Sequence, residues 1–577
     1  MLSHLNTFFP RQSNFRIQYN FSKMFCFQCE QTMDGKGCTV KGKCGKSAEV
    51  SALQDLLVAQ LKHLNSIVHH AKENDVKPVT TYSDHFNLEG LFATLTNVNF
   101  DEKRFQKYLE KGEKLIEFYL KNGGEKLKSV LHENGIQTAD FSYSKPLKDL
   151  IKTGKEYQLD LTEEKRPVIF TKELIMYGLK GGAAYLDHAR LLGYEDTSLY
   201  HYLSESLQKL SLPVSEFSLE SLLEFALQTG NWNLSCMELL NRANTESYGH
   251  PEITTVSTTP VDGKCILVSG HDLRDLKLLL EQTEGKGVNV YTHGEMLPGN
   301  AYPELKKYSH LKGNYGGAWQ DQVKEFAKFP GPILMTTNCL IPPAKNYSKR
   351  VFTRSSVGFS NLKHIENDDF SEIIKMAKKQ KGFKNTKKLA LKDIIVGFGM
   401  NQTLALADLI IDAVKEGAIK HFFLIGGCDG AEKERNYFEK LAEKTPKDTV
   451  ILTLACGKYR FNKKDLGVIE FKGNKIPRVL DVGQCNDAYS AIQIALALAN
   501  AFDTDVNSLP LSFAVSWFEQ KAVSILLTLL HLGIKNIFLG PALPAFLEPS
   551  VLDVLVKLFG IRPIGDVDED LKLMLKK

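Results

Sequence analysis

Seven short apolar runs in the second half of the chain end beside a residue that can bind a metal. Each run is followed by glycine or polar residues and then by a helical pattern, which is typical of βα units on a parallel sheet. Ligands bind outside the carboxyl ends of such strands, where loops converge. Strands of two sheets can therefore bring all seven side chains to one buried site. These residues are His271, Glu295, Cys339, Cys428, Cys456, Cys485 and Glu519.

The seven residues combine four thiols with two carboxylates and one imidazole. Thiolates favour iron–sulfur assemblies, whereas carboxylates and imidazole suit harder iron with oxygen ligands. A cluster bridged partly by sulfide and partly by oxygen needs this mixture. A single such residue at a strand end is usually structural, but seven in the same relative place favour a metal site. An enzyme with a cysteine nucleophile and a zinc site are the alternatives.

A second group of cysteines lies near the N-terminus in a glycine-rich stretch, with the spacing C-x2-C-x8-C-x5-C. It consists of Cys26, Cys29, Cys38 and Cys44. Glycines in and beside the loops let backbone N–H groups approach cluster sulfurs. The spacing matches neither common ferredoxin pattern, and it leaves both an iron–sulfur cluster and a structural zinc site open. The other two cysteines, Cys236 and Cys265, have neither setting.

Hydrophobic periodicity divides the chain into a helical part and two α/β parts. Apolar residues recur at steps of three and four between Ala48 and Tyr248, which predicts a helical bundle. The lysine-rich segment 378–392 separates the α/β parts, as a solvated linker or as a docking surface for an acidic electron donor. We expect a helical domain over 24–250 that includes the N-terminal cysteines. Two α/β domains with mainly parallel, Rossmann-like sheets should follow over 251–385 and 386–577.

Composition is that of a globular protein, with 43% hydrophobic and 24% charged residues and a net charge of +4 over 577 residues. It gives no reason to expect nucleic-acid binding, and no apolar run is long enough to predict a membrane span. We expect a monomer or a loose dimer. Residues 1–23 carry only basic charge and resemble an organellar presequence. This predicts a mitochondrion-related, hydrogenosome-like organelle, or the cytoplasm if the segment is a tail or an upstream start.

Long, specific motifs follow one another along residues 24–577. They are MFCFQCEQT, GCTVKGKCGK, SGHDL, YTHGEMLP, GNYGGAWQDQ, MTTNC, IGGCDG, LACGKYRFNK, DVGQCNDAYSA and SWFEQKA. Together they resemble the hybrid cluster protein family, also called prismane proteins or hydroxylamine reductases. The resemblance implies a [4Fe-4S] cluster on the N-terminal cysteines and a hybrid [4Fe-2O-2S] cluster on the seven strand-end residues. It also implies a persulfide at Cys428. Phe518 stands before Glu519 where many members have tyrosine.

The activity that this resemblance implies is the reduction of hydroxylamine to ammonia and water, with nitric oxide reduction to nitrous oxide as a second activity. Both would protect an anaerobic organelle from nitrosative stress. A protein S-nitrosylase and a non-catalytic iron–sulfur sensor or electron carrier are the alternatives. Electrons should enter through the N-terminal cluster. The chain lacks a G-x-G-x-x-G dinucleotide fingerprint, so we expect a separate ferredoxin or reductase as donor.

Four residues are candidates for the chemistry itself. Glu519 and Glu295 are carboxylates that can change coordination, and Cys428 is the expected persulfide. Lys521 lies two residues beyond Glu519 and can donate a proton or stabilise negative charge; the alternative for this lysine is a surface ion pair. His271 should bind metal through one ring nitrogen, with its orientation fixed by a hydrogen bond at the other.

Overall fold

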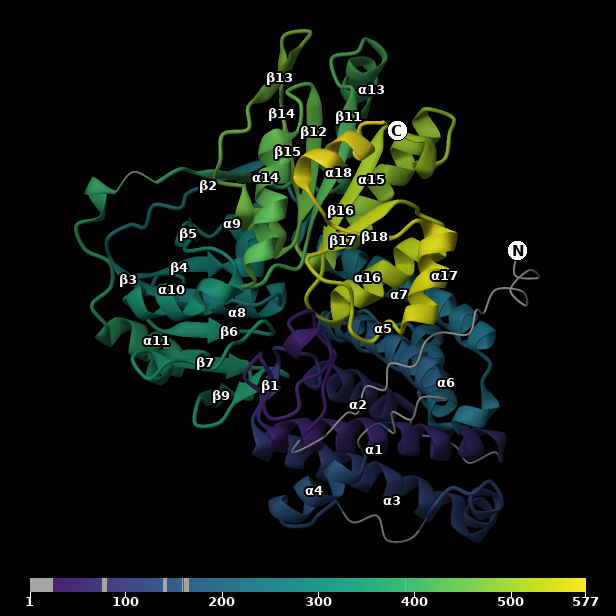
Figure 1. Cartoon of the computed structure of the whole chain (residues 1–577). Coiled ribbons are helices and arrows are strands. Elements are labelled where there is room, and N and C mark those ends of the chain that lie inside the picture. The colour runs from purple at the N-terminus through teal and green to yellow at the C-terminus, as the bar shows by residue number, and fades with distance from the viewer. Residues whose placement is uncertain are drawn as a thin grey trace.

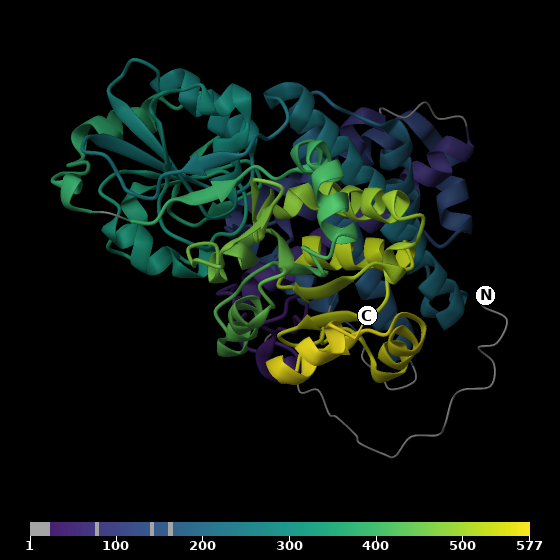
Figure 2. The ribbon, with the colours of Figure 1, turned by 90° about the horizontal axis from the view of Figure 1, so that it is seen from above.

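A computed structural model describes residues 24–74, 80–138, 143–157, 159, 165–389 and 391–576. Residues 1–23, on which the targeting prediction depends, lie outside the described residues. Figure 1 shows a helical part below, a first sheet at the left and a second sheet above. Figure 2 shows the same elements from above, with the teal first sheet to one side of the green and yellow second sheet. The fold class expected from the sequence is confirmed.

The helical part is built from long amphipathic helices. Its helices are α1 (Ala48–Glu73), α2 (Thr80–Ala93), α3 (Glu102–Glu133), α4 (Leu147–Gly154), α5 (Arg166–Leu191), α6 (Thr197–Ser211) and α7 (Leu219–Tyr248). Several begin at side chains that accept a hydrogen bond from a backbone N–H group of the first turn, as Ser47 does for α1 and Ser218 does for α7. The leucine stripe of α1 is fully buried. None of the described helices is long and apolar enough to cross a membrane.

The first sheet has six parallel strands in the order β5-β4-β3-β6-β7-β9. They are β3 (Lys264–Ser269), β4 (Val288–His293), β5 (Leu311–Asn314), β6 (Ile333–Met335), β7 (Val351–Arg354) and β9 (Lys363–Ile365). Between and after the strands lie α8 (Leu273–Thr283), α9 (Pro303–Lys306), α10 (Gln322–Lys328) and α11 (Ser371–Lys379). β8 (Gly358–Phe359) pairs with β1 (Asn99–Phe100), which joins this region to the helical part.

The second sheet also has six parallel strands, in the order β15-β12-β11-β16-β17-β18. They are β11 (His421–Gly427), β12 (Thr449–Leu454), β15 (Val479–Gly483), β16 (Leu511–Ser516), β17 (Ile537–Gly540) and β18 (Arg562–Pro563). Its helices are α12 (Met400–Ala405), α13 (Ala407–Lys415), α14 (Asn436–Lys444), α15 (Ala488–Ala501), α16 (Gln520–His531), α17 (Pro549–Phe559) and α18 (Val567–Met574). β13 (Val468–Phe471) and β14 (Asn474–Pro477) form a separate hairpin.

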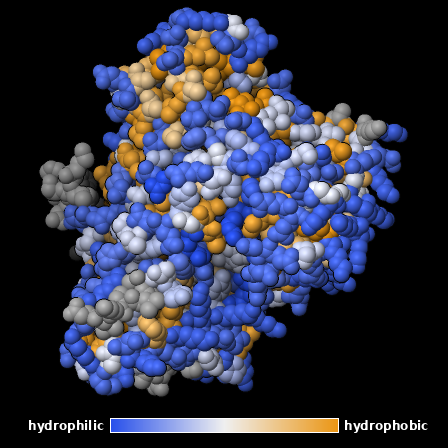
Figure 3. All heavy atoms as spheres, turned by 180° about the vertical axis from the view of Figure 1, so that it is seen from behind, coloured by the Kyte–Doolittle hydropathy of each residue, from blue (hydrophilic) through white to orange (hydrophobic). Residues whose placement is uncertain are grey.

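The chain connects the two sheets through a short antiparallel pair. β10 (Ile394–Val396) follows the lysine-rich segment and pairs with β2 (Thr254–Val256), which precedes the first sheet. The view from behind in Figure 3 shows a mostly hydrophilic face, with apolar side chains gathered at the upper end of the molecule. That end carries the second sheet and its helices in Figure 1.

Two glycines let α16 pack directly against the helical part. A Cβ atom at Gly181 of α5 would overlap the Ser524 hydroxyl, and one at Gly230 of α7 would overlap the Leu527 carbonyl. The close approach is fixed by hydrogen bonds: the Ser524 hydroxyl donates to the Gly178 carbonyl at 2.7 Å, and the Thr528 hydroxyl donates to the Gly230 carbonyl at 2.8 Å. Helix α16 therefore presses its first turn, which follows Glu519, against α5.

Candidate metal centres

The seven predicted ligands lie at the carboxyl ends of strands from both sheets, and all seven are buried. The first sheet supplies His271 after β3, Glu295 after β4 and Cys339 after β6; the second supplies Cys428 after β11, Cys456 after β12, Cys485 after β15 and Glu519 after β16. Glu519 is the N-cap of α16, and its carboxylate accepts a hydrogen bond from the Lys521 backbone N–H group at 3.0 Å.

Three of these residues form a compact group. Ligand atoms of His271, Glu295 and Cys485 lie within 4.8 Å of one another. The Glu295 Oε2 atom lies 3.8 Å from His271 Nε2 and accepts a hydrogen bond from the Cys485 backbone N–H group at 2.8 Å. The other carboxylate oxygen, Oε1, is buried and has no hydrogen-bond partner among the described residues. A buried carboxylate oxygen without a donor is costly unless a cation faces it.

The His271 ring is oriented as a metal-binding histidine needs to be. Its Nδ1 atom lies 2.8 Å from the Asn338 carbonyl oxygen, which can only accept, so the ring proton is on Nδ1. The lone pair of Nε2 is then free on the side of Glu295. A backbone carbonyl that holds the outer nitrogen of a ligating imidazole fixes both its tautomer and its direction. The expected hydrogen bond at the second ring nitrogen is therefore present.

The remaining four residues are close enough to influence one another electrostatically. Burial raises the pKa of the Cys339 thiol, and the charges of Glu519 and Cys428 raise it further. Burial also raises the pKa of Cys428 to about 12, again with a contribution from Glu519. The pKa of Cys456 rises for the same reasons, through burial and then through Glu295 and Cys339. Thiols in such a site become thiolates only with a cation to pair with.

Lys521 is fully buried among these anionic groups. Burial alone would lower the pKa of its ammonium, but the charges of Cys485 and Glu519 outweigh burial and raise it. Its Nζ atom lies 3.5 Å from the Asn486 amide oxygen. The alternative of a surface ion pair is therefore wrong for this lysine. The sequence could not exclude it, because the first turn of an amphipathic helix is often exposed.

Two polar residues of α5, Tyr185 and His188, reach the same region but were missed by the sequence analysis. The Tyr185 hydroxyl and the His188 Nε2 atom are buried without a hydrogen-bond partner among the described residues. Burial raises the pKa of Tyr185, as do the charges of Cys485 and Glu519. Burial, and then Lys521, lowers the pKa of His188 to about 3. Their spacing of three residues, which puts both side chains on one face of α5, was the available signal.

The N-terminal cysteines lie on an isolated antiparallel β-bridge between Cys26 and Cys38 and on the loops beside it. Cys26 and Cys38 exchange backbone hydrogen bonds of 3.1 and 2.8 Å, and none of the four forms a disulfide. Burial raises the pKa of Cys26 to about 12, and the charges of Cys44 and Cys38 add to the shift. Lys46 is buried beside them. Burial lowers the pKa of Lys46 to about 8, although the charge of Cys44 opposes this.

Arg435 connects this N-terminal motif to the strand-end site. It is completely buried, and its guanidinium donates to the Glu30 carboxylate at 2.7 Å, to the Cys428 carbonyl at 2.8 Å and to the Trp517 carbonyl at 2.9 Å. The Glu30 backbone N–H group donates to the Phe518 carbonyl at 3.0 Å. One cation thus ties together the loops that follow Cys29, β11 and β16.

Phe518 and Gln520 make further contacts in the region that Arg435 connects. The Phe518 ring is fully buried and packs on the Trp319 ring at a centroid distance of 4.6 Å. The Gln520 side-chain amide donates to the Gln28 carbonyl at 2.6 Å. The segments around Gln28 and Phe518 therefore lie side by side, and the space at residue 518 is filled by an aromatic ring without a hydroxyl.

We expect Arg435→Met to destabilise the protein by about 3–5 kcal/mol, because it leaves the Glu30 carboxylate buried without its cation. The loss should appear as a lower apparent unfolding temperature in calorimetry. The double variant Arg435→Met/Glu30→Gln should recover part of the loss, since no charge is then left unpaired.

Arg274→Met is the matched control for this prediction. Arg274 also pairs with a carboxylate, that of Asp368 at 2.6 Å, but both side chains are partly exposed. Such a pair contributes about 0–1 kcal/mol. Equal losses of stability in Arg274→Met and Arg435→Met would show that the buried Arg435–Glu30 pair stabilises the protein no more than an exposed pair does.

Comparison with known proteins finds similar sequences that match almost the whole chain. Residues 24–572 match the Prismane/CO dehydrogenase family. A hydroxylamine reductase of Maridesulfovibrio salexigens is 50% identical over 556 residues, which cover 96% of this chain and 100% of that protein. The hydroxylamine reductase of Syntrophobacter fumaroxidans is 51% identical over 560 residues, with coverage of 96% and 100%.

Solved structures share the fold at low sequence identity. A carbon monoxide dehydrogenase from Thermococcus sp. AM4 superposes with a TM-score of 0.53 at 17% identity, over 97% of this chain and 91% of that one. Carbon monoxide dehydrogenase IV of Carboxydothermus hydrogenoformans gives a TM-score of 0.53 at 16% identity, over 97% and 93%. The family match, the close relatives and the shared fold agree, and the chain belongs to the Prismane/CO dehydrogenase family.

Proposed function

We propose that this chain is a hydroxylamine reductase, which reduces hydroxylamine with two electrons and two protons to ammonia and water. The observation that carries the proposal is the mixed donor set of four thiols, two carboxylates and one imidazole, buried around a lysine. The relatives named hydroxylamine reductase, about half identical over nearly their full length, support the same activity.

The seven strand-end residues fit a hybrid [4Fe-2O-2S] cluster. The unpartnered Glu295 Oε1 atom and the free Nε2 lone pair of His271 offer hard donors, and four free cysteines offer soft ones. When bound, such a cluster supplies a Lewis acid and the electrons that break the N–O bond. The chain itself supplies Lys521, whose ammonium can donate a proton or stabilise negative charge at the centre of the site.

A polar cleft is the path that we propose for protons and for hydroxylamine. It has a volume of about 620 Å³ and is lined by charged side chains of α3, α5, α8 and β7. Two of its lining residues are Asp187 and Asp272, which directly adjoin His188 and His271 in the sequence. A small polar molecule keeps hydrogen-bond partners along such walls, which lowers the cost of leaving water.

A separate apolar cavity favours nitric oxide as a second substrate. It has a volume of about 60 Å³ and extends between α15, α16 and β16 to Cys428 and Cys485. Its walls are almost entirely apolar, with Ala491 and Ala495 among them. Hydroxylamine would lose its hydrogen bonds there, whereas nitric oxide has few to lose. The two substrates would then reach one site by different routes.

The N-terminal cysteines suit a [4Fe-4S] cluster better than zinc. Tetrahedral zinc with Zn–S bonds near 2.3 Å needs thiolate sulfurs about 3.8 Å apart. In the part of the chain that the structure describes, these four thiols do not form a group with ligand atoms within 4.8 Å of one another. The match of residues 24–572 to the Prismane/CO dehydrogenase family supports an iron–sulfur cluster at these cysteines.

Electrons would enter at this N-terminal cluster from a separate acidic ferredoxin or reductase. Cys26 and Cys44 are partly exposed, whereas the four strand-end cysteines are buried. The loops beside them expose Lys36 and Lys41, and the apolar side chain of Val40 is 52% exposed. Exposed lysines and an exposed apolar side chain on neighbouring loops suit an acidic partner.

Cys428→Ser should lose iron and abolish hydroxylamine turnover, because it removes a proposed ligand. Lys521→Met should keep its iron and lower kcat by about 10²–10⁴-fold, because it removes a proton donor. Iron and sulfide content, and turnover under anaerobic conditions with a low-potential donor, distinguish the two effects.

Cys236→Ser is the matched control, since Cys236 is a buried free thiol on α7, remote from the predicted ligands in sequence. Full iron content and full activity in both Cys428→Ser and Glu519→Ala would contradict the ligand assignment. Iron-replete protein that turns over neither hydroxylamine nor nitric oxide would instead be a sensor or an electron carrier.

Ala495→Phe should lower kcat/KM for nitric oxide several-fold and leave hydroxylamine turnover unchanged, because the ring fills the apolar cavity and not the polar cleft. Ala407→Phe is the control, since it lies in a different small apolar pocket. Equal losses with both substrates would show that the apolar cavity is no separate route. The unfolding temperature of each variant identifies losses that arise from overpacking.

Lys36→Glu/Lys41→Glu should raise the KM for an acidic ferredoxin by about tenfold at low salt, because it reverses the charge that steers the donor. Turnover with dithionite should not change. Lys378→Glu/Lys379→Glu tests the lysine-rich segment as the docking surface. A loss confined to that second variant would move the proposed donor site there.

A further inference from the structure

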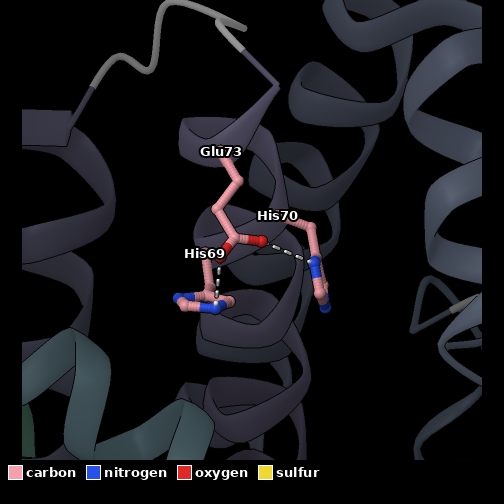
Figure 4. A group of neighbouring side chains, drawn as sticks. All are labelled: His69, His70 and Glu73. Carbon is pink, nitrogen blue, oxygen red and sulfur yellow. Dashed lines mark hydrogen bonds and ion pairs between the residues drawn. The ribbon is translucent and has the colours of Figure 1, made fainter.

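We propose that the last turn of α1 is a binding site for a divalent transition-metal ion such as Zn²⁺, separate from both predicted cluster sites. The ligands are the imidazoles of His69 and His70 and the carboxylate of Glu73, and Glu205 of α6 orients one imidazole. Figure 4 shows the Glu73 carboxylate between the two imidazoles, with a dashed line to each of them. Their ligand atoms lie within 4.8 Å of one another.

Each oxygen of the Glu73 carboxylate faces a different imidazole. His69 Nε2 lies 3.4 Å from Glu73 Oε1, and His70 Nδ1 lies 3.2 Å from Glu73 Oε2 (Figure 4). Ligand atoms at about 2.0–2.1 Å from a tetrahedral zinc are about 3.3–3.4 Å apart. These two separations are therefore close to those between neighbouring ligands of such an ion, and rotation of the partly exposed side chains would complete the geometry.

A carboxylate on the neighbouring helix holds His69 from behind. Glu205 Oε1 lies 3.4 Å from His69 Nδ1, the nitrogen that does not face Glu73. A carboxylate accepts the proton of this nitrogen, which leaves the lone pair on Nε2 and directs it to the ligand position. This pairing of an outer carboxylate with a ligating histidine is the usual support of protein metal sites.

The site has further titratable neighbours on both helices, His201 on α6 and Lys72 on α1. Glu205 also lies 4.0 Å from His201 Nδ1, and Lys72 Nζ contacts the same nitrogen at 3.2 Å. The His70 side chain is 12% exposed and the Glu73 side chain 56%. Solvent can therefore reach the site, and water can complete the coordination.

The donor set selects the class of metal. Two imidazoles and one carboxylate suit Zn²⁺, Cu²⁺ or Ni²⁺, whereas Mg²⁺ and Ca²⁺ need mostly oxygen ligands. A bound ion would crosslink the last turn of α1 and, through Glu205, fix it to α6. Because the ion binds the folded chain, it should raise the unfolding temperature of the protein.

Zinc binding to the anaerobically purified holoprotein tests the proposal, because the cluster cysteines are then occupied. After removal of loose metal with a chelator, equilibrium dialysis against Zn²⁺ with elemental analysis should show one zinc more per wild-type chain than per His70→Ala chain. Glu205→Gln should keep the site but weaken it about 10–100-fold. Zn²⁺ should raise the unfolding temperature of the wild type and not that of His70→Ala.

His85→Ala is the matched control. His85 also pairs with a glutamate, Glu195 at 2.9 Å, but no second histidine among the described residues pairs with that carboxylate. Its zinc content should equal that of the wild type. Equal zinc binding by the wild type and His70→Ala, or no zinc binding by the wild-type holoprotein, would overturn the proposal. Circular dichroism of His70→Ala confirms that any loss of zinc is not a loss of the helix.

Discussion

The buried guanidinium of Arg435 is the contact on which the arrangement of both predicted metal centres depends. It is paired with Glu30, 405 residues away in the sequence, and it also binds the carbonyl of Cys428. Removing a charge from water is costly, so this pair is stable only because several acceptors converge on the guanidinium. The same geometry holds the loop after Cys29 against the loop after β11. Movement of the N-terminal motif away from the strand-end site would therefore unpair a buried charge.

Lys521 is a second buried cation, at the centre of the strand-end site, and it too depends on the groups around it. Lys521 could not stay charged in an apolar core, because burial favours its neutral form. Its pKa is nevertheless raised, since Cys485 and Glu519 supply negative charge around it. The lysine and the anionic ligands thus stabilise one another. Their positions depend in turn on the close packing of α16 against α5, which Gly181 permits. A side chain at that glycine would displace the helix that carries Lys521.

Local patterns were enough to predict the parallel sheets and the strand ends, because the position of a residue after a strand is a property of the nearby sequence. His271 and Cys428 follow their strands as the motifs indicate. Contacts between distant segments could not be predicted in this way. Neither the partner of Arg435 nor the approach of Tyr185 from α5 follows from periodicity. Lys521 shows the same limit, since only the packing of α16 decides that its first turn is buried and not exposed.

The polar cleft and the apolar cavity, which we propose as routes to the buried site, differ in the polarity of their walls. Hydroxylamine and nitric oxide are both too small to be distinguished by shape. They differ in what they lose on leaving water, since hydroxylamine gives up several hydrogen bonds and nitric oxide almost none. The cleft beside Asp272 preserves such bonds, whereas the cavity beside Ala495 does not. Along these proposed routes, specificity would reside in the walls of the approach as well as in the residues that would hold the cluster, so a change in one wall would alter the turnover of one proposed substrate and not of the other.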